Sequence, residues 1–365
     1  MIIGIDGNEA NIPKRVGVGR YAQELLKQLA KARGFHFQIY LKQHPLPDLP
    51  QKSEYWRYQV VGPPKLWTQF GLPLALCFKK PRPAVFFSPS HYAPRFSPCP
   101  KVVSVLDLAF IHFPQMFRSK DLWQLKLWTA YSVKKAVRVL TISESTKNDI
   151  IRYYSLPEKR VVVAYPGFSM KAIKRGQSLE LIKKKYGLKG DYLLSVGTIQ
   201  PRKNYPRLIE AFSKLPKKIG ELVIVGKKGW LWEETLKAPQ KYGVEARVKF
   251  LDYVSDENLS SLYQGAKCFI LVSLYEGFGI PALEAMTYGC PVVVSNISSL
   301  PEVVGEAGVL VDPNNPTDIA RGIKEAVADR QDLIKKGLVQ CRQFSWEKTA
   351  KQTLAVLEEV GRGHV

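Results

Sequence analysis

The sequence predicts an α/β protein built from two doubly wound halves, each a parallel sheet with helices on both faces. A length of 365 residues exceeds the roughly 100–200 residues of one ordinary domain, which indicates two domains. An apolar content of 45% is enough for hydrophobic cores and excludes a disordered or collagen-like chain. Short apolar runs rich in Val, Ile and Phe alternate with longer helical patterns along the chain, as they do in βα units.

The first half begins with a predicted strand over residues 1–6. A loop that contains Gly17 and Gly19 follows, and then a helix is predicted from Tyr21 to about Arg33. Ser143, followed by Glu144, predicts a capped helix start. The other predicted strands of this half, each bounded by turn residues, cover residues 35–41, 84–88, 101–106, 137–142 and 161–164.

A stretch rich in Gly, Lys and Arg between residues 166 and 189 predicts the boundary between the halves. We expect one domain over 1–185, a second over 186–345, and a helix over 346–365 that packs back towards the first domain. In open α/β sheets ligands bind outside the carboxyl ends of the strands, so we expect the site in a cleft between two facing sheets. The predicted strands of the second half cover residues 192–196, 221–225, 248–250, 268–272, 291–295 and 308–311.

The cysteines and the apolar segments indicate a cytoplasmic protein. Five scattered cysteines form no Cys-x-x-Cys pair, so neither a disulfide framework nor a thiolate zinc site is expected. Asp6 and Glu9 interrupt the apolar N-terminus, which argues against a secretory signal. The longest apolar stretch, 66–78, is shorter than the ~20 residues of a spanning helix. We therefore expect a soluble or peripheral protein.

The positive charge is unevenly distributed. Residues 1–190 carry 32 Lys and Arg against 11 Asp and Glu, whereas residues 191–365 carry 22 against 21. Such an excess can attract nucleic acid, an anionic membrane or an acidic substrate. Nucleic acid is not expected, because the sequence has no finger, basic zipper or RNP-type motif. Segments 65–80 and 116–138 mix aromatics with cations, which suits an anionic membrane surface, although an amphipathic helix with buried aromatics has the same pattern.

The first motif that indicates chemistry reads Gly-Thr-Ile-Gln-Pro-Arg-Lys-Asn over residues 197–204, directly after a predicted strand. Gly197 allows a tight turn, and Arg202 and Lys203 bring two cations to the edge of the sheet. Cations and amide donors that converge there suit a phosphate or a diphosphate. Taken alone, the motif could also be a solvated turn.

The second motif reads Glu-Gly-Phe-Gly-Ile-Pro-Ala-Leu-Glu over residues 276–284 and follows the predicted strand 268–272. Gly277 and Gly279 lack Cβ atoms, so their N–H groups can approach a ligand closely. Glu276 and Glu284 can bracket an elongated ligand and accept hydrogen bonds from its hydroxyl groups. Glu284 alone could instead cap the helix or face solvent. A carboxylate in such a loop, like that of Glu276, is expected to support little core packing.

Together the two motifs, about 75 residues apart, resemble the retaining glycosyltransferases of family 4, which have the GT-B fold. Residues 4–6, 17–21, 140–144 and 344–346 also match that family. The resemblance implies two Rossmann-like domains that face a central cleft. It also implies transfer of a hexosyl unit, such as mannose from GDP-mannose, to a glycan or lipid-linked acceptor in cell-surface polysaccharide synthesis. The layout is similar to that of bacterial polysaccharide mannosyltransferases, and members with lipid-linked acceptors are often peripheral at the inner membrane face.

The resemblance further implies roles for individual residues. Lys203 and Arg202 would hold the donor diphosphate, Glu276 the donor sugar, and Glu284 the ribose hydroxyls. The residues expected to be catalytic are Glu276, Lys203, Arg202 and Asp107. The residues expected to bind the donor are Gly17, Gly19, Gly197, Gly277, Phe278, Gly279 and Glu284. No metal and no cofactor are expected, because the GDP- or UDP-linked donor is a substrate and the sequence has no Asp-x-Asp motif.

Three positions depart from the family pattern. Thr198 stands where many relatives have Arg, and Asp252 stands where a glycine is common. Leu106 precedes Asp107 where relatives often have His, which removes a titratable group beside the expected acceptor. His91 is then the nearest imidazole on the acceptor side, although a lone loop histidine is more often structural.

Two other functions remain open on the sequence alone. One is a nucleotide-sugar 2-epimerase of the same fold, which would interconvert a nucleotide sugar without an acceptor. The other is a non-catalytic protein that binds nucleotide sugars, because the departure at Leu106 could abolish transfer. Release of nucleotide in the presence of an acceptor distinguishes a transferase from both.

Overall fold

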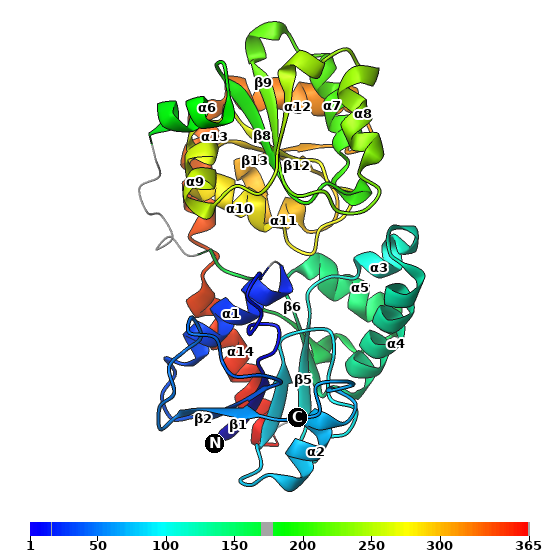
Figure 1. Cartoon of the computed structure of the whole chain (residues 1–365), viewed down its shortest axis with the longest axis vertical. Coiled ribbons are helices and arrows are strands. Elements are labelled where there is room, and N and C mark those ends of the chain that lie inside the picture. Colours follow the sequence, from blue (N-terminus) through cyan, green and yellow to red (C-terminus); the bar gives the residue numbers. More distant parts are fainter. Residues whose placement is uncertain (16, 169–177, 364–365) are drawn as a thin grey trace. The chain divides into compact units, whose positions relative to one another are not determined.

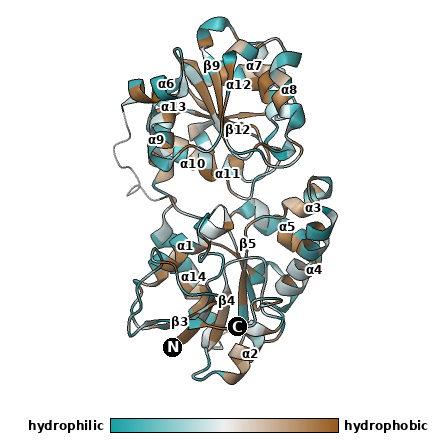
Figure 2. Ribbon diagram, viewed as in Figure 1, coloured by the Kyte–Doolittle hydropathy of each residue, from teal (hydrophilic) through white to brown (hydrophobic). Residues whose placement is uncertain are grey.

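Thirteen strands in the described part of the chain form two separate parallel sheets, each in its own unit (Figure 1). The computed structural model describes residues 1–15, 17–168 and 178–363. The first unit contains Met1–Gly167 and Ser345–Val365, and the second contains Phe168–Phe344. In both units the strands are predominantly brown in Figure 2, which shows that apolar residues fill the sheets.

The unit boundary lies earlier in the chain than the expected residue 185. Helix α6 (Leu179–Tyr186) belongs to the second unit, where it packs against α9 (Asp256–Gly265). Ile182 of α6 is buried, and Asn258 of α9 donates a hydrogen bond to the hydroxyl of Tyr186. The stretch 166–189, rich in basic residues and glycines, therefore contains a packed helix of the second unit as well as the expected connection. Residues 169–177 of the predicted connection lie outside the described residues.

The sheet of the first unit has the order β3-β2-β1-β4-β5-β6-β7. Its strands are β1 (Ile2–Asp6), β2 (His36–Leu41), β3 (Trp56–Val60), β4 (Val85–Ser88), β5 (Lys101–Val105), β6 (Arg138–Thr141) and β7 (Val161–Val163). Six of them were predicted, with ends that agree within one residue. Strand β3 was missed because it lies at the edge, pairs only with β2, and carries half-exposed polar residues.

The described residues of the first unit form six α-helices. They are α1 (Val18–Leu29), α2 (Gly71–Phe78), α3 (Ala109–His112), α4 (Ser119–Lys135), α5 (Glu144–Tyr154) and α14 (Trp346–Gly361). The predicted cap of α5 is confirmed, because Ser143 Oγ accepts a hydrogen bond from the Thr146 N–H at 3.0 Å. Helix α14 packs against α1 and β4 of this unit, and its Glu359 pairs with Arg138 at 2.6 Å.

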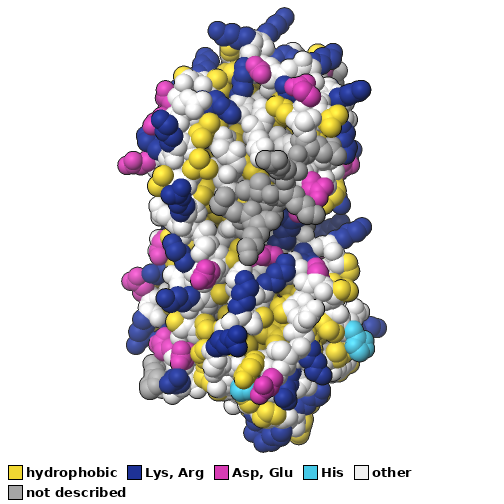
Figure 3. Space-filling model, turned by 90° about the vertical axis from the view of Figure 1, so that its left-hand side faces the viewer, with side chains coloured by type: hydrophobic (Ala, Val, Ile, Leu, Met, Phe, Trp, Pro, Cys, Tyr) yellow, Lys and Arg dark blue, Asp and Glu magenta, His cyan; other side chains and the backbone are white. Residues whose placement is uncertain are grey.

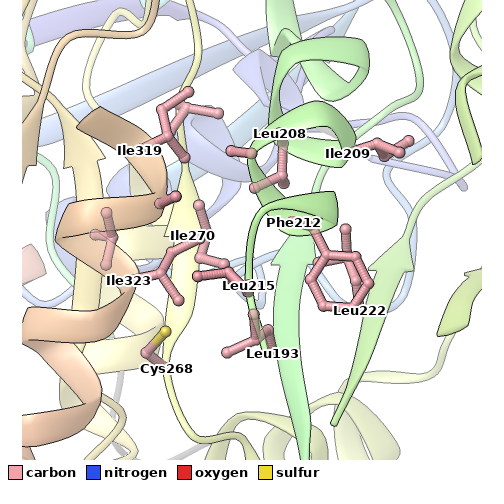
Figure 4. Packing of buried hydrophobic residues seen from close by; sticks show 14 of the residues in the cluster. Leu193, Leu208, Ile209, Phe212, Leu215, Leu222, Cys268, Ile270, Ile319 and Ile323 are labelled. Carbon is pink, nitrogen blue, oxygen red and sulfur yellow. The ribbon is translucent and has the colours of Figure 1, made fainter. Parts of the chain in front are cut away.

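The sheet of the second unit has the order β10-β9-β8-β11-β12-β13, and all six strands were predicted. They are β8 (Tyr192–Val196), β9 (Glu221–Val225), β10 (Val248–Leu251), β11 (Phe269–Leu271), β12 (Val292–Ser295) and β13 (Gly308–Val311). Besides α6 and α9, its helices are α7 (Tyr205–Ser213), α8 (Glu233–Lys241), α10 (Ile280–Thr287), α11 (Leu300–Val304), α12 (Pro316–Ala328) and α13 (Arg330–Cys341). Figure 4 shows how Phe212 of α7 and Ile323 of α12 lie among buried strand residues such as Ile270.

The strand order determines where each sheet can bind a ligand. In the second unit β8 lies between β9 and β11, so the chain runs outward on one side of β8 and then returns to its other side. In the first unit β1 and β4 have the same relation. Loops on the two sides of such a switch point diverge and leave room for a ligand at the carboxyl edge. Among the described residues, no helix combines the length and the apolar character needed to span a bilayer.

Candidate functional site

The two sequence motifs of the second unit meet at the β8/β11 switch point. The loop after β8 carries Arg202 and Lys203, and the loop after β11 carries Glu276. A backbone hydrogen bond from the Leu274 N–H to the Arg202 carbonyl, 2.8 Å long, ties the two loops together. The amide of Asn204 reinforces this contact by donating to the carbonyl of Val272 at 3.1 Å.

Glu276 lies between two cations. Its Oε1 is 2.5 Å from Lys203 Nζ, and its Oε2 is 3.1 Å from Arg202 Nη1. Glu276 and Lys203 are only 7% and 8% exposed, so both charges are almost completely withdrawn from bulk solvent. Arg202 also donates a hydrogen bond to the carbonyl of Tyr275. The sequence predicted these three residues in one site but not that they pair with one another.

The electrostatics of this triad keep Glu276 ionised. Burial is the largest single influence on its pKa and raises it, but the attraction of Lys203 and Arg202 together lowers the pKa to about 2. Glu276 is therefore a charged acceptor of hydrogen bonds at neutral pH. Glu276 also neutralises two cations in a buried site, a structural role that the sequence did not predict.

The glycine-rich loop is fixed by two serines that the sequence reading did not single out. Ser298 Oγ donates to the Glu276 carbonyl at 2.6 Å and accepts from the Glu276 N–H at 3.1 Å. Ser299 Oγ is 2.9 Å from the carbonyls of both Glu276 and Phe278. These serines follow β12, the next strand of the sheet, and that position is the sequence signal that could have identified them.

Glycine is required at two positions of the loops. Gly279 precedes α10 with a φ of 105°, and a Cβ there would lie 2.5 Å from Leu300 Cδ2. A Cβ on Gly197 would lie 3.0 Å from Lys203 Cε, so the small residue leaves room for the lysine side chain. Phe278 is buried and packs edge-on against Phe344, with ring centroids 5.4 Å apart. Its side chain is thus structural, while its backbone belongs to the loop.

Glu284 lies on the second turn of α10, as the sequence predicted. Its Oε2 accepts a hydrogen bond from the Tyr263 hydroxyl at 3.0 Å. The Tyr263 ring stacks on Tyr288, with centroids 5.7 Å apart and planes 11° apart. Glu284 is half-buried, so this contact holds the carboxylate in place while part of it remains accessible.

The remaining predicted residues belong to the first unit. Gly17 precedes α1 with a φ of 45°, and a Cβ on Gly19 would lie 2.9 Å from the Glu9 carbonyl. Asp107 follows β5, and its Oδ1 accepts a hydrogen bond from the Ala109 N–H at 3.0 Å at the start of α3. The first sheet therefore positions four predicted residues, which are Gly17, Gly19, His91 and Asp107. The residues predicted to contact the donor sugar and the ribose follow strands of the second sheet.

His91 follows β4 and has an electrostatic partner. Burial lowers the pKa of this imidazole, and the charge of Asp107 opposes that change. Its Nδ1 is buried and has no hydrogen-bond partner in the structure. Leu106, which precedes Asp107, is buried and contributes to packing.

Asp6, at the carboxyl end of β1, is a titratable group to which the sequence assigned no role in the site. It is buried, and its Oδ1 accepts hydrogen bonds from the N–H and Nδ2 of Asn8 at 3.0 and 2.8 Å. Burial raises its pKa to about 6, against the opposing effect of those hydrogen bonds. No group of three His, Cys, Asp or Glu side chains in the described ranges is arranged to hold a metal ion.

Both halves of the chain match glycosyltransferase family models. Residues 16–171 match the family model described as "Glycosyltransferase Family 4", and residues 179–339 match "Glycosyl transferases group 1". The chain is 32% identical to the O-antigen chain mannosyltransferase B of Escherichia coli over 93% of this chain and 94% of that protein. It is also 33% identical to the serotype-specific mannosyltransferase WbdA of Escherichia coli, over 60% of this chain and 28% of that longer protein.

Solved structures with the same fold cover almost the whole chain. Sucrose-phosphate synthase from Thermosynechococcus elongatus aligns with a TM-score of 0.76 and 19% identity, covering 99% of both chains. Anabaena HepE, solved with UDP-glucose, aligns with a TM-score of 0.73 and 18% identity over 98% of this chain and 99% of that one. At this level of identity the structures establish the GT-B fold. The family models and the full-length relative together show that this chain belongs to the family 4 glycosyltransferases and is a glycosyltransferase.

Proposed function

We propose that the chain transfers a mannosyl unit from GDP-mannose to a glycan or lipid-linked acceptor during synthesis of a cell-surface polysaccharide, with retention at the anomeric carbon. The choice of sugar rests on relatives named as mannosyltransferases, one of which matches nearly end to end. The named relatives do not favour the epimerase or the non-catalytic binding protein that the sequence left open. A UDP-linked hexose is the alternative donor, and the experiment below tests it beside GDP-mannose.

The observation that carries the proposal is the Lys203–Glu276–Arg202 triad at the β8/β11 switch point. Both cations lie where a diphosphate would meet the carboxyl edge of the sheet. When the bond between the sugar and the diphosphate breaks, negative charge accumulates on the leaving nucleotide. Fixed cations that are withdrawn from solvent stabilise that charge, and we propose that they do so without a metal ion.

Glu276 has two roles in this proposal. Without donor, it balances the charges of Lys203 and Arg202. With donor bound, the diphosphate takes over one or both cations, and the ionised carboxylate becomes available to the sugar hydroxyls. In the structure without donor its pKa is about 2, so the carboxylate is ionised at neutral pH before the donor binds. Glu284, held by Tyr263, is proposed to bind the ribose.

On the acceptor side, we propose that His91 and Asp107 orient the incoming hydroxyl group. The His91 side chain is half-buried, and the lowered pKa of the ring keeps it neutral at pH 7. A neutral imidazole nitrogen can accept a hydrogen bond from a hydroxyl. We assign no nucleophile, because positioning and charge stabilisation can supply most of the acceleration.

The test is release of nucleotide from GDP-mannose, UDP-glucose and ADP-glucose, each with and without a mannose oligosaccharide acceptor and with a chelator in a parallel series. We expect acceptor-dependent release of GDP that the chelator does not change. Interconversion of the donor without acceptor would indicate the epimerase. Binding of a donor without release under any condition would indicate the non-catalytic protein, and loss of activity with the chelator would contradict the metal-independent proposal.

A further inference from the structure

A buried tyrosine of the second unit donates a hydrogen bond to the carboxylate of Glu284. Tyr263 lies on α9 and is only 1% exposed, and its hydroxyl is 3.0 Å from Glu284 Oε2 on α10. Figure 1 shows the two helices side by side, and they pack against each other. Among the described residues, Glu284 is the one hydrogen-bond partner of this hydroxyl. The phenol is therefore satisfied only while it points at that carboxylate.

Aromatic contacts fix the ring that carries this hydroxyl. The Tyr263 ring stacks on Tyr288, and it also contacts Phe269 of β11, with centroids 5.5 Å apart. Tyr288 in turn meets the ring of Phe168 edge-on, with centroids 6.0 Å apart. Because close-packed neighbours restrict a buried ring to one rotamer, the hydroxyl stays directed at Glu284.

The hydroxyl of Tyr263 also stays protonated. Burial, together with the charge of Glu284, raises the pKa of this phenol well above its ordinary value. A neutral phenol donates one hydrogen bond, and a carboxylate can only accept. A hydrogen bond to an ionised acceptor is stronger than one between neutral groups, so this contact holds the carboxylate firmly.

Charge alone does not distinguish Glu284 from other carboxylates. Figure 3 shows Asp, Glu, Lys and Arg side chains spread over the surface of the second unit, in the upper half of the view. An unrestrained glutamate samples several rotamers, and binding a ligand hydroxyl then costs the freedom that the side chain loses. Tyr263 removes part of that freedom beforehand, because it holds Oε2 of a carboxylate that is only half-buried. Glu284 is thus pre-organised as a hydrogen-bond acceptor.

We propose that Tyr263 is a positioning residue that enables Glu284 to select a ribose over a deoxyribose in the donor nucleotide. The inference rests on the proposed role of Glu284 as the ribose ligand, and it assigns the orientation of that carboxylate to α9. A site built to bind a hydroxyl group rejects an analogue that lacks it, because the buried acceptor then loses its bond. The ribose does not react, so Tyr263 acts on donor binding and not on the chemical step.

The test is isothermal titration calorimetry with GDP and with 2′,3′-dideoxy-GDP, which lacks both ribose hydroxyls. The wild-type protein should bind GDP at least about tenfold more tightly than the dideoxy compound, and Glu284→Ala should remove this preference. Tyr263→Phe keeps the ring and deletes only the hydroxyl. It should weaken GDP binding about threefold to tenfold, because Glu284 must then be ordered on binding, and it should change binding of the dideoxy compound less than about twofold.

Tyr192→Phe is the matched control. Tyr192 is also fully buried in this unit, and its hydroxyl donates a hydrogen bond to the Leu262 carbonyl of α9 at 2.8 Å. Both substitutions therefore delete one buried tyrosine hydroxyl that contacts a neighbouring element, but only Tyr263→Phe releases Glu284. The control should keep the wild-type preference for GDP.

Four results of the titrations would overturn the proposal. They are a wild-type protein without the preference, equal weakening of both nucleotides in Tyr263→Phe, wild-type affinity for both nucleotides in Tyr263→Phe, and the same loss of preference in Tyr192→Phe. The second of these results is the one that a tyrosine with only a structural role would give. Because the ribose is common to GDP and UDP, the base of the donor does not enter the argument.

Steady-state transfer from GDP-mannose separates this inference from the proposed function. Tyr263→Phe should raise the KM for the donor about threefold to tenfold and leave kcat within about twofold of the wild type, because Lys203 and Arg202 are unchanged. A wild-type protein with a ribose preference that Tyr263→Phe reduces, but without sugar transfer, would contradict the proposed function and leave this inference standing. Normal transfer by the wild type, with a fall in kcat instead of a rise in KM in Tyr263→Phe, would overturn the inference alone.

Discussion

At the scale of single residues, the site depends on a carboxylate that serves structure and chemistry together. Glu276 is buried between Lys203 and Arg202, and its charge balances theirs. Removing one partner of a buried ion pair leaves an uncompensated charge, which usually costs about 3–5 kcal/mol. Loss of transfer in a Glu276 variant is therefore informative only when the stability of the variant is measured as well.

We predict that Glu276→Ala lowers the free energy of unfolding by about 3–5 kcal/mol and abolishes transfer. Adding Lys203→Met should restore part of the stability, because the double variant removes the buried lysine charge along with the carboxylate. Transfer should remain lost. Urea denaturation of the two single variants and the double variant measures the coupling. Additive losses of stability would show that the pair contributes nothing as a pair.

Asp6 predicts a pH dependence of stability with the opposite sign to that of Glu276. Its pKa is about 6 in the folded chain and 3.8 in the reference state, so the folded state holds the extra proton between these values. The free energy of unfolding should therefore be higher near pH 4 than near pH 7, by up to about 3 kcal/mol from this group. Asp6→Asn should remove that slope. Urea denaturation at several pH values measures how the free energy of unfolding changes with pH. The same pH dependence in Asp6→Asn as in the wild type would contradict the assignment.

Glu276 acts in a lower pH range. Its pKa is lowered from 4.5 to about 2, so its contribution is complete above about pH 4.5 and is lost as the pH falls towards 2. The two groups together predict a stability maximum near pH 4–5 for their combined contribution. Glu276→Gln should flatten only the acid side of that profile, and Asp6→Asn only the side above pH 4.

At the scale of elements, the two connections between the units lie against each other within the first unit. A Cβ on Gly167 would lie 2.0 Å from the Trp346 nitrogen and 2.3 Å from the Ser345 carbonyl carbon, both backbone atoms. Next to this contact, Thr349 of α14 donates a hydrogen bond to the Tyr165 carbonyl at 2.5 Å. The start of α14 is thus held against the end of the segment Met1–Gly167. The two backbones approach so closely that residue 167 must be a glycine.

We predict that Gly167→Ala lowers the melting temperature of the protein, because the two backbones must separate to admit the methyl group. The free energy of unfolding should fall by about 1–3 kcal/mol, as is typical of overpacking. Gly190→Ala is the matched control, since a Cβ there has nothing within 4 Å. Differential scanning calorimetry of both variants checks the prediction. Equal melting temperatures for the two variants would show that the chain relaxes around residue 167 without cost.

The elements that the sequence predicted and those it missed differ in burial. Strands such as β8 and β9 are buried apolar runs bounded by turn residues, so their periodicity identified both ends. Strand β3 (Trp56–Val60) pairs only with β2, and its sequence alternates apolar and polar residues, so it lacks the continuous apolar run that identified the central strands. Helix α1 begins at Val18 rather than Tyr21, and the Tyr21 N–H already donates a hydrogen bond to the Gly17 carbonyl at 3.0 Å.

At the scale of the whole molecule, the unit boundary changes how the charge is shared. The first unit carries 28 Lys and Arg against 13 Asp and Glu, and the second carries 26 against 19, by count over the ranges of each unit. The net charges are thus +15 and +7 rather than the +21 and +1 of the two sequence halves. The first unit is still the more positively charged. The difference is smaller because the basic stretch before β8 belongs to the second unit and not to the first.

The residues of the candidate site could be predicted from the sequence, but the contacts among them could not. The residue types of both motifs predicted a diphosphate site, and the structure brings Lys203, Arg202 and Glu276 into contact. Their pairing could not be predicted, because 73 residues separate Lys203 from Glu276 and the contact depends on β8 lying beside β11. Ser298 and Ser299 were missed although β12 was predicted, because using their position after β12 required knowing that β12 pairs with β11.

The central claim is that Lys203 and its partners form the donor site, and titration of Lys203→Met with GDP tests it most directly. The variant keeps Arg202 beside Glu276, so the carboxylate is still paired and the chain should fold. Loss of a charged hydrogen bond to the diphosphate, about 1.5–3 kcal/mol, should weaken GDP binding roughly tenfold to a hundredfold by isothermal titration calorimetry. Lys241→Met on α8 should bind like the wild type. A folded Lys203→Met variant that binds GDP with wild-type affinity would contradict the account.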